Sequence, residues 1–188
     1  FKVDGDQIGR LHPNGGIALG LGASSSVNQA FAIGENASAG NTSNYAFGKG
    51  ANASGSSAYA IGESSVSSQN KSYAIGTSST ASGTSSYAIG EGSASLATGS
   101  YAIGAGANSS ATGSFAIGNQ SISASNNTLA LGNEAQAINN NATALGYQAI
   151  ASNQNSIAIG PATTSVDNSI ILGNTTNTTT DSYAATKV

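Results

Sequence analysis

The sequence predicts an all-β fold, a parallel β-solenoid of about twelve 14-residue coils. A four-residue element ending in glycine recurs twelve times along the chain. The glycines are spaced by 14 residues ten times in succession from Gly20 to Gly160, and then once by 13. Within each unit, large and small residues alternate with the period of two that is typical of strands. Self-similarity at a fixed spacing indicates stacked structural repeats.

The first strand of each unit is predicted at the repeated element itself. Counting from its first residue, position 1 is usually aromatic or aliphatic, position 2 is Ala in all copies but the last, position 3 is Ile, Leu or Phe, and position 4 is Gly. This order gives a strand two unlike faces. The repeat glycines are Gly20, Gly34, Gly48, Gly62, Gly76, Gly90, Gly104, Gly118, Gly132, Gly146, Gly160 and Gly173.

A second, shorter strand is predicted around positions 7 to 9. Position 7 is always Ala, Ser or Thr, from Ala23 to Thr163 and Thr176, and position 9 is equally restricted. Ser, Asn and Gly fill most of the other positions, which suits tight turns between strands. Two short strands and two turns make a flat coil, and coils stacked about 4.8 Å apart form parallel ladders.

Composition agrees with a thin coil and excludes several classes of function. Ala, Ser, Gly, Asn and Thr make up 126 of the 188 residues, and Cys is absent. Disulfides and thiolate metal sites are therefore excluded. With 5 basic and 8 acidic residues, the chain lacks the basic clusters that nucleic acid binding requires. No run of 18 apolar residues is present to span a membrane, so we expect no direct membrane contact by this segment.

Catalytic, metal and cofactor sites are not expected either. The one histidine, His12, lies beside Pro13 before the regular coils, and no catalytic triad can be assembled around it. Asp4 and Asp6 are better explained as a solvated cap than as a metal site, which needs several convergent ligands. We therefore expect a nonenzymatic protein without cofactors.

A row of charged residues is predicted along one edge of the solenoid. Glu35, Glu63 and Glu91 occupy position 5 of alternate coils, about 10 Å apart, and Lys49 lies in the coil between the first two. We assign this row to solubility and register.

The large residues at positions 1 and 3 are assigned to the core or to an interface between identical chains. A thin coil cannot enclose large side chains from both strands. An aromatic row exposed on a monomer would make a large apolar patch, so we expect a homo-oligomer in which a partner chain covers at least one column. The assigned residues are Phe31, Ile33, Tyr45, Phe47, Tyr59, Ile61, Tyr73, Ile75, Tyr87, Ile89, Tyr101, Ile103, Phe115 and Ile117.

The repeat resembles the head of YadA-type trimeric autotransporter adhesins, whose units read approximately Asn-Ser-Val-Ala-Ile-Gly. Ser72-Tyr-Ala-Ile-Gly76, Asn155-Ser-Ile-Ala-Ile-Gly160 and Asn168-Ser-Ile-Ile-Leu-Gly173 carry the resemblance, which covers about residues 17 to 183. It implies a left-handed parallel β-roll with three chains around a threefold axis, a homotrimer. The middle coils depart from the family pattern because Tyr or Phe stands at position 1.

The resemblance also implies a function. It implies a nonenzymatic adhesin head at the bacterial surface, on the outer membrane, that takes part in virulence by binding host extracellular matrix, host cells or abiotic surfaces. The predicted domains are an N-terminal cap at 1–16, head repeats at 17–173, and a last partial coil with the start of a neck or connector at 174–188.

Two alternatives stay open. The final segment, Asp181 to Val188, also resembles junctions of trimeric bacteriophage tail fibres, which would place the roll in a virion fibre that binds a bacterial surface. An ice-binding solenoid is a further alternative. A regular column of exposed Thr would be needed for it, whereas Thr here clusters between Thr175 and Thr180.

Overall fold

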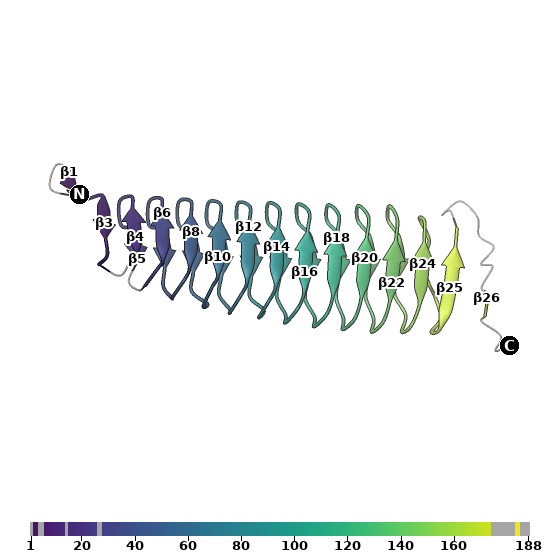
Figure 1. Cartoon of the computed structure of the whole chain (residues 1–188). Coiled ribbons are helices and arrows are strands. Elements are labelled where there is room, and N and C mark those ends of the chain that lie inside the picture. Colours follow the sequence, from purple (N-terminus) through teal and green to yellow (C-terminus); the bar gives the residue numbers. More distant parts are fainter. Residues whose placement is uncertain (1, 4–5, 14, 26–27, 174–182, 185–188) are drawn as a thin grey trace.

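The computed structural model describes residues 2–3, 6–13, 15–25, 28–173 and 183–184. These residues form an elongated rod of stacked coils without any helix (Figure 1). Each of the first ten coils contributes one strand to each of two sheets that run along the rod. A helix with the length and hydropathy to cross a membrane is not found among the described residues.

The long sheet is built from the repeated four-residue element, as predicted. Pairing is parallel and shifted by one unit, so that Tyr59 lies opposite Tyr73 and Ile61 opposite Ile75. Twelve successive parallel strands give about 11 turns of solenoid. Its parallel strands are β4 (Ile17–Leu19), β6 (Phe31–Ile33), β8 (Tyr45–Phe47), β10 (Tyr59–Ile61), β12 (Tyr73–Ile75), β14 (Tyr87–Ile89), β16 (Tyr101–Ile103), β18 (Phe115–Ile117), β20 (Leu129–Leu131), β22 (Thr143–Leu145), β24 (Ile157–Ile159) and β25 (Ser169–Leu172).

The short sheet consists of two-residue strands at positions 8 and 9. Val66 lies opposite Thr80 and Ser67 opposite Ala81, again with a 14-residue shift. Its strands are β5 (Ser24–Ser25), β7 (Ser38–Ala39), β9 (Asn52–Ala53), β11 (Val66–Ser67), β13 (Thr80–Ala81), β15 (Ala94–Ser95), β17 (Asn108–Ser109), β19 (Ile122–Ser123), β21 (Gln136–Ala137) and β23 (Ile150–Ala151).

Antiparallel strands border the stack at both ends. At the N-terminal end, β3 (Gly9–Leu11) pairs antiparallel with β4, and β1 (Lys2–Val3) pairs with β2 (Asp6–Gln7). At the other end, β26 (Tyr183–Ala184) pairs antiparallel with β25. Residues 174–182 and 185–188, which belong to the predicted connector, lie outside the described residues, and the domain limits of 1–16, 17–173 and 174–188 stay predictions.

Two tight turns connect the strands of each coil. In the first turn, the N–H of Ser79 donates to the carbonyl oxygen of Gly76 at 3.2 Å. In the second turn, the N–H of Ser72 donates to the backbone carbonyl oxygen of Gln69 at 3.2 Å. Each turn holds one residue in the left-handed region, such as Ser78 with φ 55° and Lys71 with φ 56°. Asn, Ser and Gly tolerate this conformation well, which explains why they fill the turn positions.

The core is a close layer of small side chains. Positions 2 and 14 of the long sheet point inward and meet positions 7 and 9 on the short-sheet side. Ala60, Ala74 and Ala88 at position 2 are fully buried, with 0% exposure. The largest fully buried side chains among the described residues are Asn44, Thr128 and Thr164. The alternation therefore places the small residues inside, and the coil has no room for a larger core.

Buried serines satisfy their hydroxyl groups within the coil. The Ser79 hydroxyl donates to the carbonyl oxygen of Gly76 at 2.8 Å, and the Ser86 hydroxyl donates to that of Gly83 at 2.7 Å. Among the described residues, no buried side-chain N or O atom lacks a hydrogen-bond partner. Because an unpaired buried polar group is costly, this local bonding explains how Ser can replace Ala throughout the core.

The last coil corrects one detail of the sequence analysis. Counting from position 1 places Thr163 at the small position 7, but its side chain is exposed, whereas Ala162 and Thr164 are buried. The missing residue of this 13-residue unit falls in the first turn, after Gly160, so every following position shifts by one. A bridge between Ile150 and Thr163 shows the same shift. Thr176 lies outside the described residues.

Candidate functional site

The outer surface of the long sheet is the candidate site and is called the apolar face below. It consists of positions 1 and 3 of the strands from β4 to β25. These side chains point away from the alanine and serine core because neighbouring residues of a strand face opposite sides. All of the residues assigned to the core or a trimer interface lie on this face. Ile33, Ile61, Ile89 and Phe115 are exposed there, and the other ten are half-buried by their neighbours along the ladder. The core of the single coil contains none of them, and their burial in a trimer interface stays a prediction.

An aromatic ladder occupies seven successive coils of the apolar face. The rings of Tyr73 and Tyr87 stack with centroids 4.7 Å apart and planes 4° from parallel. The whole row has centroid spacings of 4.7 to 5.2 Å and interplanar angles of at most 11°. In-register pairing at the strand spacing enforces this stacking. The row consists of Phe31, Tyr45, Tyr59, Tyr73, Tyr87, Tyr101 and Phe115.

One hydroxyl group of the ladder has a raised pKa. Burial among its neighbours raises the pKa of Tyr73 above the ordinary value of 10.0, and the nearby phenols of Tyr87 and Tyr59 raise it further. Both causes disfavour a phenolate in the row. The hydroxyl of Tyr73 therefore stays protonated to a higher pH than an ordinary phenol.

The ladder ends at a hollow. Phe115 is the last ring, and Leu129 and Thr143 follow it at position 1. An open hollow of about 480 Å³ lies where the side chains become smaller, lined by Gly113, Phe115, Asn127, Thr128 and Leu129. Its position on the apolar face makes it part of the same surface.

The repeat glycines position this face by letting successive coils approach closely. Gly76 has φ +134°, and a Cβ on it would lie 2.5 Å from the carbonyl oxygen of Gly90. A similar approach recurs from Gly20 to Gly132, and it changes at the end of the rod, where Gly173 has open space around it. The first eleven repeat glycines combine a positive φ with a close approach, which no L side chain accommodates well.

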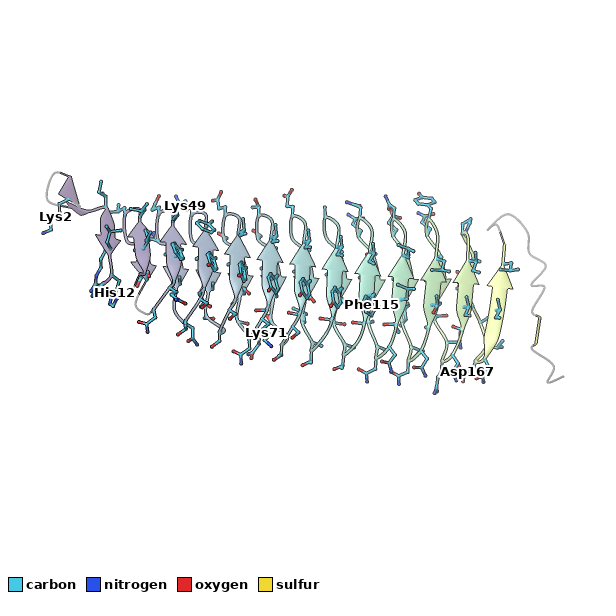
Figure 2. The ribbon with its side chains drawn as sticks, viewed as in Figure 1. Lys2, His12, Lys49, Lys71, Phe115 and Asp167 are labelled. Carbon is cyan, nitrogen blue, oxygen red and sulfur yellow. The ribbon has the colours of Figure 1, made fainter. Side chains whose placement is uncertain are left out.

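The edges of the rod carry the few charges of the coils. We call the tips at positions 5 and 6 the first-turn edge and the tips at positions 11 to 13 the second-turn edge. The predicted row lies on the first-turn edge, where the Lys49 ammonium is 3.3 Å from the Glu35 carboxylate. Figure 2 shows Lys49 on this edge and Lys71 on the opposite one. Lys71 is not among the predicted site residues, although this lysine interrupts a turn column of otherwise uncharged residues from Gln29 to Asn155.

Of the residues weighed for catalysis or metal binding, His12 has a described side chain. His12 lies between β3 and β4, where its N–H donates to the carbonyl oxygen of Gly16 at 2.8 Å, and Asp4 lies outside the described residues. Among the described residues, no group of three His, Asp or Glu side chains is arranged to hold a metal ion.

Comparison with known proteins identifies the repeat. The family model described as the YadA head domain repeat (2 copies) matches six overlapping windows, 53–79, 67–93, 81–107, 95–121, 123–149 and 137–163. Together they cover more than half of the chain. The chain belongs to the YadA head family. The aromatic ladder lies largely inside the matched windows, so these coils keep the YadA head repeat while replacing its position 1.

A solved structure agrees with this assignment. The crystal structure of the collagen-binding domain of the Yersinia adhesin YadA is 30% identical to this chain, with a TM-score of 0.63. The similarity covers 73% of this chain and 78% of that one. No curated protein matches the chain. The YadA head assignment therefore rests on both the repeat and the three-dimensional fold.

Proposed function

We propose that the chain is the head of a trimeric, nonenzymatic adhesin displayed at the outer membrane surface of a bacterium. The observation that carries the proposal is the apolar face of a YadA head repeat, which runs along the rod on one side of each coil. A soluble protein rarely leaves so long an apolar surface uncovered. A second and a third copy of the chain offer the same face with the same repeat, and a threefold arrangement covers all three faces equally.

The proposed mechanism is multivalent attachment by a stiff rod. With the apolar faces turned inward, the short sheets and the two turn edges of three chains remain outside. Identical coils then repeat a weak contact along each chain and around the trimer, so that the contacts add through avidity. Because the similar YadA domain is described as collagen-binding, we propose a host matrix protein or a host cell surface as the target.

The two alternatives have less support. A tail-fibre module shares the expectation of a trimer, but the family match and the similar adhesin structure favour the adhesin. An ice-binding surface needs a regular column of Thr, whereas the outward position 8 of the short sheet varies from Asn52 and Val66 to Thr80 and Ala94. A measurement of thermal hysteresis tests whether the chain binds ice.

The first test is the mass of the 188-residue chain in solution. Light scattering is expected to give three times 18.2 kDa, together with a β-type circular dichroism spectrum. Ile75→Asp places a carboxylate on the apolar face and is expected to prevent trimer formation. Thr77→Asp adds the same charge on the first-turn edge, two residues away, and is expected to leave the mass unchanged. A folded monomer for the unaltered chain would refute the trimer.

The second test is attachment. The trimer is applied to surfaces coated with fibrillar collagen, with other matrix proteins or with albumin, and binding is compared with that of Ile75→Asp. Avidity predicts retention of the trimer and weak retention of the variant. Equal binding to albumin and to every matrix coating would contradict a matrix target.

A further inference from the structure

Two charged residues of one coil lie on opposite edges of the rod. Glu63 follows Lys49 in the position 5 column, where the N–H of Ser64 donates to the carbonyl oxygen of Lys49 at 2.8 Å. Lys71 lies on the second-turn edge of the same coil (Figure 2). Both side chains are exposed. Within the described part of the chain the ion pair is Lys49 with Glu35, so neither Glu63 nor Lys71 has an ionic partner in its own subunit.

Lys71 is unusual for its position. It has φ 56°, in the left-handed region, at a turn position that the other coils fill with Gln, Ser, Gly or Asn. A long basic side chain has no backbone reason to stand there, since Asn and Gly suit this conformation better. Between residues 28 and 156, Lys71 is also the one charged residue on the second-turn edge. The conformation of the turn therefore does not explain the positive charge at this position.

Threefold symmetry supplies a partner for it. When three flat coils turn their apolar faces to a common axis, the first-turn edge of each subunit adjoins the second-turn edge of its neighbour at every corner. Rotation about the axis keeps the height along the rod, so equivalent coils meet. Glu63 and Lys71 are eight residues apart in a 14-residue coil, which corresponds to a rise of about 3 Å. Glu91, the next acidic residue along the rod, lies about 7 Å higher along the rod than Lys71.

We propose that Glu63 of one subunit forms an ion pair with Lys71 of the partner subunit, three times around the trimer. The proposal rests on the trimer proposed above. The pair sets the register of the three chains. The apolar face repeats every coil, so sliding one chain by a coil costs little apolar contact. A slip in one direction brings Lys71 opposite Lys49 of the partner subunit, with repulsion, and a slip in the other brings it opposite Thr77, without attraction.

The test uses the absence of Cys from the chain. Glu63→Cys and Lys71→Cys are combined in one chain, and the purified protein is oxidised mildly. Because the two residues lie on opposite edges of their own coil, a disulfide forms only between subunits, and it closes a ring of three chains. The expected result is a covalent trimer on a non-reducing denaturing gel. The control combines Lys71→Cys with Glu91→Cys, more than one coil away, and is expected to stay largely uncrosslinked.

The outcomes separate this inference from the proposed function. A trimeric mass without any 63–71 crosslink overturns the ion pair and leaves the trimer standing. A monomeric mass overturns both. Crosslinks in single Glu63→Cys chains would indicate a twofold contact in which like residues meet, and would also overturn the inference.

A charge exchange gives an independent readout. Glu63→Lys and Lys71→Glu are each expected to lower the thermal midpoint of the trimer by about 2 to 4 °C, since exposed ion pairs contribute little individually. The double exchange is expected to restore it, because the pair is re-formed with opposite polarity. A double variant whose loss equals the sum of the single losses would contradict a direct contact.

Discussion

The hydroxyl oxygens of Ser67 and Ser72 lie 2.6 Å apart inside one coil, where they connect the short sheet to the start of the next strand of the long sheet. Ser67 Oγ also donates to the carbonyl oxygen of Ser72 at 2.7 Å. The same arrangement recurs at Ser95 with Ser100, 2.6 Å apart. Two Ala residues occupy these positions at Ala53 with Ala58, and one Ala and one Ser at Ala81 with Ser86. The core therefore accepts two hydroxyls, two methyl groups or one of each at this place.

Replacing one serine of the Ser67–Ser72 pair is expected to cost more unfolding free energy per substitution than replacing both. Ser67→Ala and Ser72→Ala should each lower the free energy of unfolding by about 1 kcal/mol, since one hydrogen-bond partner is lost. The double variant reproduces the pair that Ala53 and Ala58 form, so its loss should be smaller than the sum by about 0.5 kcal/mol or more. Urea unfolding at fixed protein concentration measures all four members of the cycle. Strict additivity would contradict the coupling.

Asn44 holds two coils together from within the core. Its Nδ2 donates to the carbonyl oxygen of Ala53 at 2.7 Å, and its Oδ1 accepts from the N–H of Ala58 at 3.0 Å. Asn44→Leu keeps a similar size but leaves the buried N–H of Ala58 unpaired, whereas the Ala53 carbonyl oxygen still accepts from the N–H of Gly40. The expected loss in the free energy of unfolding is about 1 to 3 kcal/mol. Asn28→Leu, on an exposed turn, is the control and should have little effect. Equal losses for the two variants would show that the buried amide is dispensable.

Substitution of a repeat glycine is expected to destabilise the fold, because the site lacks space for a Cβ and has a positive φ. Gly76→Ala places a Cβ 2.5 Å from the Gly90 carbonyl oxygen at φ +134°, and should cost at least about 3 kcal/mol of unfolding free energy. Gly92 has φ +61° with nothing within 4 Å of an added Cβ. Gly92→Ala therefore carries only the left-handed penalty of about 1 to 2 kcal/mol. Chemical unfolding compares the two, and a loss at Gly92 as large as at Gly76 would refute the close-approach argument.

The tyrosine ladder should make stability fall at alkaline pH. The pKa of Tyr73 is raised in the folded state, first by burial and then by Tyr87 and Tyr59. Its contribution to stability is therefore complete below the unfolded value of 10.0 and is lost as the pH rises through the folded pKa. Thermal midpoints measured from pH 8 to pH 11 should decline above about pH 10.

Tyr73→Phe is the matched variant for this prediction. It keeps the stacked ring and removes the ionisable hydroxyl, so its decline above about pH 10 should be less steep than that of the unaltered chain. A variant with an identical pH profile would show that Tyr73 does not carry the dependence.

The coil was predictable because its signals are local and repeated. The 14-residue spacing of the glycines specified the register that pairs Tyr59 with Tyr73, and small residues at positions 7 and 9 marked the second strand. The count of positions shifts in the 13-residue unit, where Ala162 and Thr164 take the inward positions in place of Thr163 and Ser165. A spacing of 13 reveals that a residue is missing, but only the burial pattern shows in which turn.

The sequence by itself determined the solenoid, its repeat length and the existence of two unlike strand faces, because a period of two is a property of any single strand. Only the tertiary structure decided which face is the core. Four inward positions share the narrow interior of each coil, and in one coil they are Ala74, Ser79, Ala81 and Ser86. These small side chains leave no room for Tyr73 or Ile75. Likewise, Glu63 and Lys71 are eight residues apart in sequence, and only the closed coil places them on opposite edges of the rod.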